Sequence, residues 1–229
     1  MKPAPVNRTI RITAAVAGTT LAIAGLHHGF FEVLQGNQPT PGFGIHSIGA
    51  DHVRWAYGTD DAITVIPNFL ATGLAAMTVS VGVIAWSIFG LHRSRGPSVF
   101  LALFVLLTLV GGGMGHIPFF VTAWAWATMV RGPLPGWGRA LGAGVRRLLA
   151  RAWLPALVAS SLLFLLGLEL SVFGYPPLAA DPDRLLVTIW SILGASLVAM
   201  NVAFLSAVAR DPVGPVPSRP HTSSTASTT

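Results

Sequence analysis

Long apolar runs recur along almost the whole chain, and they restrict the possible folds more than any other feature. Apolar runs of about 17 to 25 residues are long enough to cross a hydrocarbon core about 30 Å thick. Only 10% of the residues are charged, whereas charged residues make up about 25% of an ordinary soluble domain. We therefore predict an all-α integral membrane bundle that forms one domain over residues 1–209. The expected spans lie near residues 10–34, 66–88, 98–113, 116–131, 154–175 and 185–209.

The apolar region over residues 98–130 decides the number of membrane passes. It is too long for one straight span and somewhat short for two, and the sequence GGGMGHIP at 111–118 interrupts it. Glycine and proline weaken a helix, so we expect the chain to turn there. Two short spans joined by this Gly-rich turn give six passes in total.

Lysine and arginine in short loops favour the cytoplasmic side of a membrane, so their positions discriminate between topologies. With the N-terminus inside and a single pass over residues 98–130, six of the 14 basic residues are cytoplasmic. With a turn at GGGMGHIP, twelve of the 14 are cytoplasmic and only Arg54 and Arg184 lie outside. We therefore predict six passes in the plasma membrane with both termini cytoplasmic. A re-entrant hairpin over residues 98–131 gives the same charge count and stays open as an alternative.

Residues 136–151, with the sequence GWGRALGAGVRRLLAR, are too charged to cross the membrane. On a helical wheel their leucine and valine side chains fall on one side and their arginines on the other. We predict an amphipathic interfacial helix on the cytoplasmic face, and a solvated connecting helix is the alternative. Each arginine near anionic lipid contributes about 1 kcal/mol. The predicted contacts with anionic inner-leaflet lipid are Arg139, Arg146, Arg147 and Arg151.

The two ends of the chain carry different signals. Residues 210–229 are rich in Pro, Ser and Thr, and we predict a disordered cytoplasmic tail because this composition has nothing to bury. At the N-terminus, basic residues precede an apolar stretch that reaches Ala24, which is also the pattern of a signal peptide cleaved before Gly25. That alternative stays open, although the apolar pattern resumes beyond the site.

Composition excludes two classes of function. The formal charge of +6 and the pI near 11.3 would suit nucleic acid in a soluble protein, but here the basic residues lie in short loops, where they set orientation. We therefore expect no nucleic-acid partner. The chain has no cysteine, which excludes disulfides, cysteine nucleophiles and cysteine-ligated metal sites.

The six-pass topology gathers most titratable side chains in the outer half of the protein. His28 and Glu32 lie one helical turn apart, on the arc that also holds Gly25 and Gly29, and such small residues let helices approach closely in lipid. Glu169 lies within a span, about 9 Å below its outer end, and ionisable groups inside a membrane are functional candidates. We predict an outward-facing pocket built from His28, Glu32, Gln35, Asn37, Asn68, His116 and Glu169.

Binding of a small ligand or a metal ion in this pocket is the first functional hypothesis. Imidazole and carboxylate groups suit Zn, Mn or Fe, so His28, Glu32 and His116 could hold a divalent metal, with His46 or His52 completing the shell. Two histidines facing each other across the bundle could instead ligate haem b.

Three further functions remain open. A transporter or proton relay fits the broken helices at Pro67 and GGGMGHIP and the ability of His and Glu chains to carry protons. A structural or accessory subunit would use the polar face to dock another membrane protein or a second copy of the chain. A membrane-embedded enzyme is less favoured, because the sequence contains no nucleophile elbow, P-loop or dinucleotide fingerprint.

The segment from Gln35 to Asp61 is too apolar for a free loop of 27 residues. Loops of this length usually have a function or pack against the protein. We predict a lid over the outer mouth of the bundle, with a short interfacial helix from Ile48 to Ala56. The alternative is a loop that rests at the lipid headgroups, with Trp55 and Tyr57 as interfacial belt residues.

The stretch HGFFEVLQGN at 28–37, taken with IPNFLATG at 66–73 and GGG at 111–113, resembles a group of small polytopic membrane proteins of bacteria and archaea that have no assigned activity. These proteins carry an H-G-x-x-E-x-L-Q-G-N stretch after the first span and a P-N near the second. The resemblance covers about residues 20–120 and implies a membrane family of unknown function. The motif positions that it implies are His28, Gly29, Glu32, Gln35, Gly36, Asn37, Pro67 and Asn68.

Overall fold

The computed structural model describes residues 6–131, 141–175 and 181–211. Helices dominate this part of the chain, and a two-stranded sheet lies in the long loop after the first helix. The elements in chain order are α1 (Arg8–Leu34), β1 (Gly44–His46), the 3₁₀ turn η1 (Ala50–His52), β2 (Asp61–Ile63), α2 (Phe69–Phe89), α3 (Gly96–Leu109), α4 (Ile117–Ala127), the 3₁₀ turn η2 (Thr128–Val130), α6 (Ala143–Phe173) and α8 (Pro182–Arg210).

Four of the described helices, α1, α2, α6 and α8, are long and apolar enough to cross a membrane. The apolar helices α3 and α4 are shorter, with 14 and 11 residues. Large apolar side chains remain exposed on the outside of the long helices, for example Leu162, Val187 and Val198 at 61 to 65% exposure. A surface of this kind suits lipid better than water. The predicted helical fold is confirmed, and its four long apolar helices are compatible with the helical membrane bundle predicted from the sequence.

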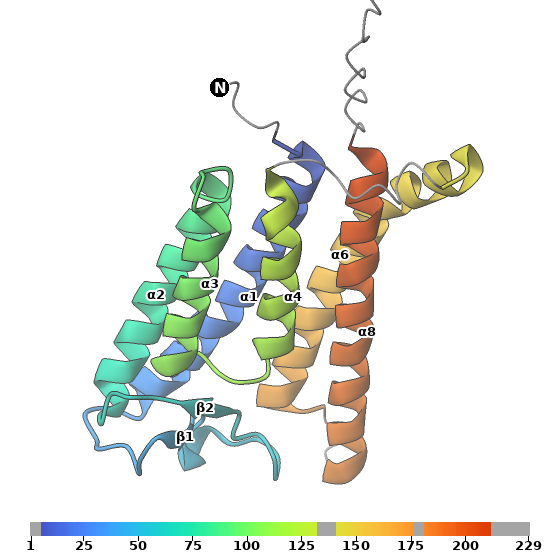
Figure 1. Ribbon diagram of the computed structural model, residues 1–229. Helices are drawn as coiled ribbons and strands as arrows, with labels where there is room; N and C mark the ends of the chain where they lie inside the picture. Colours follow the sequence, from blue (N-terminus) through green and yellow to red (C-terminus); the bar gives the residue numbers. More distant parts are fainter. Residues whose placement is uncertain (1–5, 132–140, 176–180, 212–229) are drawn as a thin grey trace, which may run out of the picture.

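Helix α1 runs through the middle of the bundle, with α2 and α3 on one side and α6 and α8 on the other (Figure 1). Stacked aromatic rings join the neighbouring helices. The rings of Phe104 and Phe120 lie 5.2 Å apart, and those of Trp126 and Phe204 lie 5.5 Å apart. These contacts attach α3 to α4 and α4 to α8, so the short helices pack into the same core as the long ones.

The small residues of α1 allow a close contact with α2, as expected from their spacing. A Cβ atom built on Gly29 would lie 2.7 Å from the carbonyl oxygen of Gly73, and one built on Gly25 would overlap the hydroxyl of Ser80. No larger side chain fits at these positions without moving the helices apart. The pairing of α1 with α2 therefore fixes the orientation of the other faces of α1.

The chain turns between α3 and α4 at the Gly-rich segment. Proline at the start of each short helix favours helix initiation there. The turn is hydrogen-bonded to the strand β2, since the backbone N–H of Gly111 donates to Ile63 at 2.9 Å and that of Met114 donates to Asp61 at 3.2 Å. The turn and the long loop are therefore held together at one end of the bundle, which we call the lid end.

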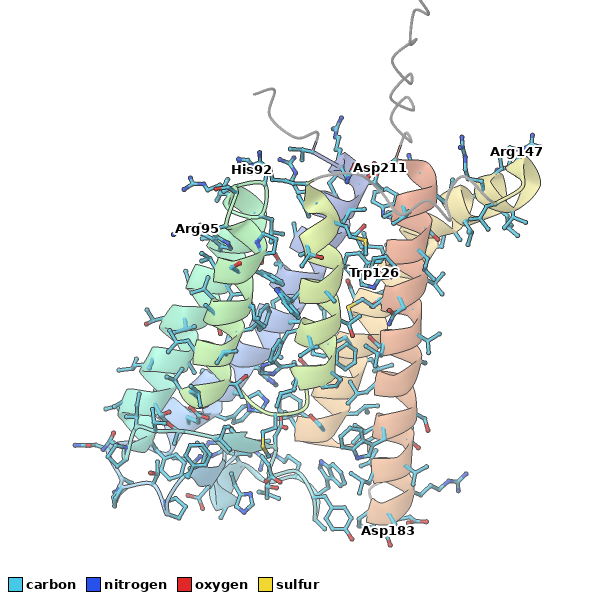
Figure 2. The ribbon with its side chains drawn as sticks, viewed as in Figure 1. His92, Arg95, Trp126, Arg147, Asp183 and Asp211 are labelled. Carbon is cyan, nitrogen blue, oxygen red and sulfur yellow. The ribbon has the colours of Figure 1, made fainter. Side chains whose placement is uncertain are left out.

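The two ends of the bundle differ in the groups that they carry. Figure 2 shows Arg95 and Asp211 at the end opposite the lid, and Asp183 at the lid end. The carboxylate of Asp211 accepts hydrogen bonds from the backbone N–H groups of Thr9 and Ile10 at 3.0 and 3.3 Å. It caps the first turn of α1, where helix N–H groups lack partners, and ties the end of α8 to the start of α1.

Helix α6 begins at Ala143 and not near residue 154, so residues 143–151 of the predicted interfacial helix are continuous with a spanning helix. This N-terminal part bends away from the bundle (Figure 1), and it carries Arg147 beyond the bundle (Figure 2). Pro155 lies inside the helix and accounts for the bend, because proline removes a backbone donor and clashes with the preceding turn. Arg139 and residues 212–229 of the predicted tail lie outside the described residues, and α8 continues to Arg210.

The loop after α1 folds into a lid built around β1 and β2, which pair antiparallel with Ile45 opposite Ala62. The short helix predicted from Ile48 to Ala56 is absent, and only the three-residue turn η1 lies there. The reason is a competing set of hydrogen bonds: the N–H of Ser47 donates to Asp60 at 3.1 Å and that of Ile48 donates to Thr59 at 3.0 Å. These bonds extend the strand pairing through Ile48, so the backbone is paired as a strand where the helix was predicted to begin.

Candidate functional site

Two ionisable side chains of α1, His28 and Glu32, are buried at the lid end. They lie four residues apart, so they are stacked on one side of the helix. His28 is 5% exposed and Glu32 is 0% exposed. A buried polar group costs free energy unless it is hydrogen-bonded or neutral. The contacts of these two side chains therefore define the site.

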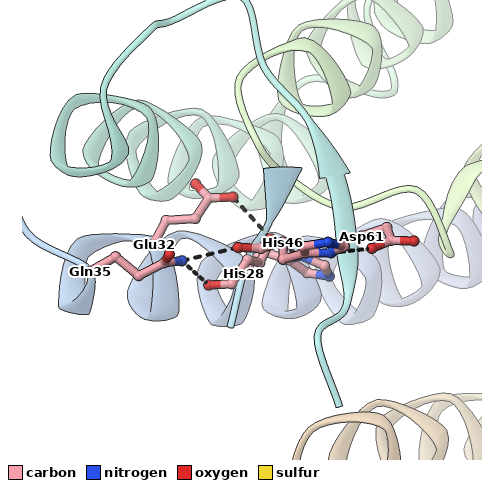
Figure 3. Close-up of polar contacts among 6 residues, drawn as sticks. His28, Glu32, Gln35, His46 and Asp61 are labelled. Carbon is pink, nitrogen blue, oxygen red and sulfur yellow. Dashed lines mark hydrogen bonds and ion pairs between the residues drawn. The ribbon is translucent and has the colours of Figure 1, made fainter. Parts of the chain in front are cut away.

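A continuous chain of hydrogen bonds joins Glu32 to Asp60 of the lid. His28 lies in the centre, with its Nε2 3.0 Å from Asp60 Oδ2 and its Nδ1 2.9 Å from Ser47 Oγ. The hydroxyl of Ser47 in turn donates to Glu32 Oε1 at 3.1 Å. Figure 3 shows His28 and Glu32 side by side along α1, facing the strand that precedes Ser47. Both ring nitrogens of His28 are thus engaged.

Asp60 reaches His28 from an unusual backbone conformation. Its φ is 48°, in the left-handed region, which aspartate tolerates better than most residues. Burial alone would raise the pKa of Asp60, but the neighbouring His28, with His27 and His116 further away, holds this pKa below its ordinary value. Asp60 is therefore the anionic end of this series of hydrogen bonds.

The Gly-rich turn covers the other side of these groups. A Cβ atom on Gly111 would overlap the carboxylate of Glu32, and one on Gly113 would overlap Nε2 of His28. Both glycines also have positive φ values, 98° and 89°, which glycine adopts without strain. Gly111 and Gly113 are explained by this contact, because only a backbone without side chains fits against the buried pair. A Cβ on Gly112, which lies between them, would instead overlap Leu107 of α3.

The remaining motif residues hold the lid at its edge. Gln35 Nε2 donates to the carbonyl oxygens of His46 and Ser47 at 3.0 and 2.7 Å. Asn68 accepts a hydrogen bond from the N–H of Ala71 and so caps α2, and its amide donates to Asn37 at 2.7 Å. The predicted pocket residues Gln35, Asn37 and Asn68 therefore position the loop and do not line a cavity. We call this set of contacts, together with His28 and Glu32, the clasp.

His116 lies at the start of α4 and is 2% exposed. Its ring packs against Phe104 and Phe120, and its Nε2 has no hydrogen-bond partner among the described residues. The side chain lines the same cavity as His28 and Asp60. The structure thus brings His28 and His116, two of the predicted pocket residues, to one cavity.

The cavity has a volume of about 320 Å³ and lies between α1, α6, α8, the lid and the turn that precedes α4. One wall carries His28, Asp60 and His116, and the opposite walls are apolar, with Phe164 and Leu168 on α6 and Ile189 and Trp190 on α8 among them. Small-molecule sites in proteins have this character, mostly apolar with a few polar groups at one place. The volume is at the small end of the range for such sites, about 300 to 1,000 Å³.

Two aromatic residues of the lid attach it over this cavity. Trp55 is buried and its indole N–H donates to the carbonyl oxygen of Ser171 on α6 at 3.0 Å. Tyr57 donates its hydroxyl to Asp183 at the start of α8 at 2.9 Å. These contacts favour the predicted lid over a loop that merely rests at the headgroups, because both aromatic side chains are bonded to the helices that form the cavity.

Glu169, which the sequence placed in the pocket, is exposed and does not line the cavity. It interacts electrostatically with His27. The other histidines of this region also lie apart from the site. His46 pairs with Asp61 at 2.7 Å on the exposed side of the sheet, and the ring of His52 packs against Phe31.

Among the described residues, no three His, Asp or Glu side chains form a group that could hold a metal ion. The predicted ligands His28 and Glu32 are joined through Ser47, and the ring nitrogens of His28 already bond Ser47 and Asp60. A metal or a haem iron would have to displace one of these partners. The geometry therefore gives the metal and haem hypotheses no support.

Ser47, His28 and Asp60 have the composition of a nucleophilic triad, but their arrangement does not suit that chemistry. A nucleophile must reach its substrate, whereas Ser47 is 1% exposed and does not line the cavity. Its hydroxyl is also bonded to Glu32. The arrangement can hold charge and move protons, and the cavity beside it can hold a small molecule.

Ser47 and Asp60 are the two residues that sequence reasoning did not place in the site. Both lie in the lid, and their contacts with α1 depend on the pairing of β1 with β2, which brings the two ends of the loop together. The loop's apolar content indicated packing, but not which of its polar residues would face inward.

Comparison of the chain with protein-family models, with curated proteins and with solved structures gives no match.

Proposed function

We propose that the protein is a membrane receptor or carrier for a small amphipathic molecule, bound in the cavity under the lid. The observation that carries this proposal is a largely apolar cavity with His28, Asp60 and His116 together on one wall. A few polar groups gathered at one place in an apolar cavity are what fixes the orientation of a bound small molecule.

The lining indicates the kind of molecule. An apolar body would pack between α6 and α8, and a polar head would meet Asp60 and His116. Asp60 and Asp61 both line the cavity, so a cationic or hydrogen-bond-donating head is favoured over an anionic one by Coulomb attraction. Trp55, Tyr57 and Trp190 add aromatic faces that attract cations.

Calorimetric titration of the purified protein with single-chain amphiphiles tests this proposal. Dodecylamine, dodecanol and dodecanoate share one apolar chain and differ in the head. We expect saturable binding in the order amine, alcohol, carboxylate. Gly115→Leu is the blocking variant, because Gly115 lines the cavity and a Cβ there meets no atom within 4 Å, so the larger side chain has room without disturbing the fold.

Gly115→Ala is the matched control, since it adds a single methyl group at the same position. We expect the control to bind as the wild type does and Gly115→Leu to lose saturable binding. The result that would refute the proposal is a binding heat that does not saturate for any of the three amphiphiles and is equal in the wild type and in Gly115→Leu. Such a result would show simple partitioning into detergent.

We propose that the chain crosses the plasma membrane six times, with the lid outside and both termini in the cytoplasm. The bias of basic residues supports this topology. So do the antiparallel course of α3 and α4 (Figure 1) and the position of Asp211 beside the start of α1. Because the chain lacks cysteine, Gly115→Cys and Ser94→Cys each introduce a single thiol. We expect an impermeant maleimide to label Gly115→Cys in intact cells and Ser94→Cys only after permeabilisation; the reverse pattern would invert the topology.

We also propose that the bent start of α6 lies on the inner leaflet and contacts anionic lipid. Its arginines Arg146, Arg147 and Arg151 are accompanied by Val145 and Leu148, which are 50 and 70% exposed. Such a segment fits a membrane surface, with apolar side chains inserted and arginines at the headgroups.

Finally, we propose that the motif shared with the membrane proteins that the sequence resembles serves as the clasp that holds the lid on α1.

A further inference from the structure

We propose that Glu32 and Asp60 share one proton through Ser47 and His28, and that this relay moves a proton between the cavity and the buried interior of the bundle. The distances along the relay, 3.1, 2.9 and 3.0 Å, are all within hydrogen-bonding range. Asp60 and His28 line the cavity, whereas Ser47 and Glu32 do not. The relay therefore leads from the cavity wall into the protein.

Each member of the relay can both donate and accept a proton. When Glu32 is protonated, it donates to Ser47, Ser47 donates to His28 Nδ1, and His28 Nε2–H donates to the carboxylate of Asp60. When the proton has moved, Asp60 is protonated and donates to His28 Nε2, His28 Nδ1–H donates to Ser47, and Ser47 donates to the carboxylate of Glu32. Ser47 and His28 each gain one proton and lose one, since His28 takes the proton at Nδ1 and gives one up from Nε2, and the relay carries one negative charge in both states.

The surroundings favour the state with the charge on Asp60. Glu32 is fully buried, and its Oε2 has no partner among the described residues, so an ionised carboxylate there would keep only the hydrogen bond from Ser47 to Oε1. The turn at Gly111 contributes no charged side chain next to Glu32. Asp60, by contrast, is partly exposed at the cavity, with a side-chain exposure of 20%.

Other titratable groups act on the cavity end of the relay. His27 on α1 and His116 at the start of α4 both interact electrostatically with Asp60, and Asp61 is its neighbour in the lid. A cationic group bound in the cavity would hold the charge on Asp60 and the proton on Glu32. A group that donates a proton to Asp60 would have the opposite effect, so the relay links cavity occupancy to the protonation of Glu32.

Infrared spectroscopy of the ligand-free protein tests the relay independently of ligand binding. The carbonyl stretch of a protonated carboxylic acid is separate from that of a carboxylate, and it shifts when the acid takes up deuterium. We expect a protonated-acid band at neutral pH in the wild type that is absent in Glu32→Gln. On transfer to D₂O we expect this band to shift quickly, because the relay connects Glu32 to the cavity.

Ser47→Ala removes the link between Glu32 and His28, and we expect it to slow the deuterium shift by at least about tenfold, which corresponds to about 1.4 kcal/mol in the barrier. Ser47→Thr restores the hydroxyl and should restore fast exchange. Ser87→Ala is the matched control, because Ser87 is also fully buried but lies outside the relay. If Ser47→Ala does not fold, His28→Gln replaces it, since an amide can hydrogen-bond but cannot relay a proton.

Two results would overturn the relay. The first is a protonated-acid band that persists unchanged in Glu32→Gln, which would show that Glu32 is ionised. The second is exchange in the folded Ser47→Ala or His28→Gln variant as fast as in the wild type. Neither result depends on the amphiphile titrations, so the relay and the ligand site can fail separately.

Discussion

Replacement of Gly113 by alanine should strongly destabilise the protein at the Gly-rich turn. Two effects add at this position. The positive φ of 89° costs a residue with a Cβ about 1 to 2 kcal/mol. The new methyl group also overlaps Nε2 of His28, and overpacking of this kind costs about 1 to 3 kcal/mol.

The expected total is therefore about 2 to 5 kcal/mol. For a protein of this size that corresponds to a fall in Tm of about 4 to 20 °C. Thermal unfolding in detergent, followed by circular dichroism, measures the fall. The contact with His28 adds a second expectation: Gly113→Ala pushes on the relay and should also change the infrared carbonyl band of Glu32.

Two other glycines separate the cost of the positive φ from the cost of the overlap with His28. Gly36 has a φ of 78°, but a methyl group added there would meet no atom within 4 Å, and Gly115 has neither a positive φ nor a neighbour. We expect Gly36→Ala to cost about 1 to 2 kcal/mol from the backbone alone and Gly115→Ala to cost less than about 0.5 kcal/mol. If Gly113→Ala melts at the same temperature as Gly115→Ala, the packing of the Gly-rich turn against His28 is refuted.

Three further changes test the contacts around the cavity. Asn68→Ala removes the cap of α2 and should cost about 0.5 to 2 kcal/mol, whereas Asn68→Asp keeps a capping oxygen and should cost less in the same melting assay. Trp55→Phe loses the hydrogen bond to Ser171 and should cost about 1 kcal/mol, and limited proteolysis should cut the lid of this variant sooner; equal cutting rates would contradict the attachment. The lowered pKa of Asp60 means that its stabilising effect is present above its unfolded-state pKa of about 3.9 and is lost as the pH falls through the lower folded-state pKa. The Tm difference between the wild type and Asp60→Asn should therefore narrow below about pH 4, and a difference that widens there would show the opposite sign.

Several features of the site could be read from spacing alone. His28 and Glu32 lie four residues apart beside Gly25 and Gly29, so one helical wheel placed both in the bundle interior, and both are buried. The interruption at 111–118 predicted a turn, and α3 and α4 do flank one. These predictions depend only on helix geometry and on the conformational limits of glycine and proline.

The misplacement of Glu169 has a different origin. Glu169 lies within α6, but the direction of its side chain depends on which face of α6 packs against α8 and which remains exposed. The apolar side chains of α6 are distributed around the helix, as is usual where lipid replaces water outside the bundle, so no amphipathic stripe marks the buried face.

The sequence by itself determined that the helices are long and apolar and roughly where they lie, because these features follow from the length of the apolar runs. It also determined the buried pair on α1, because the pair follows from the period of a helix. Only the tertiary structure decided which lid residues meet that pair. Ser47 and Asp60 are 13 residues apart in the chain, and each reaches His28 because the strands β1 and β2 pair in one register while the Gly-rich turn closes the other side. Register and long-range packing depend on contacts between distant segments, which no local pattern encodes.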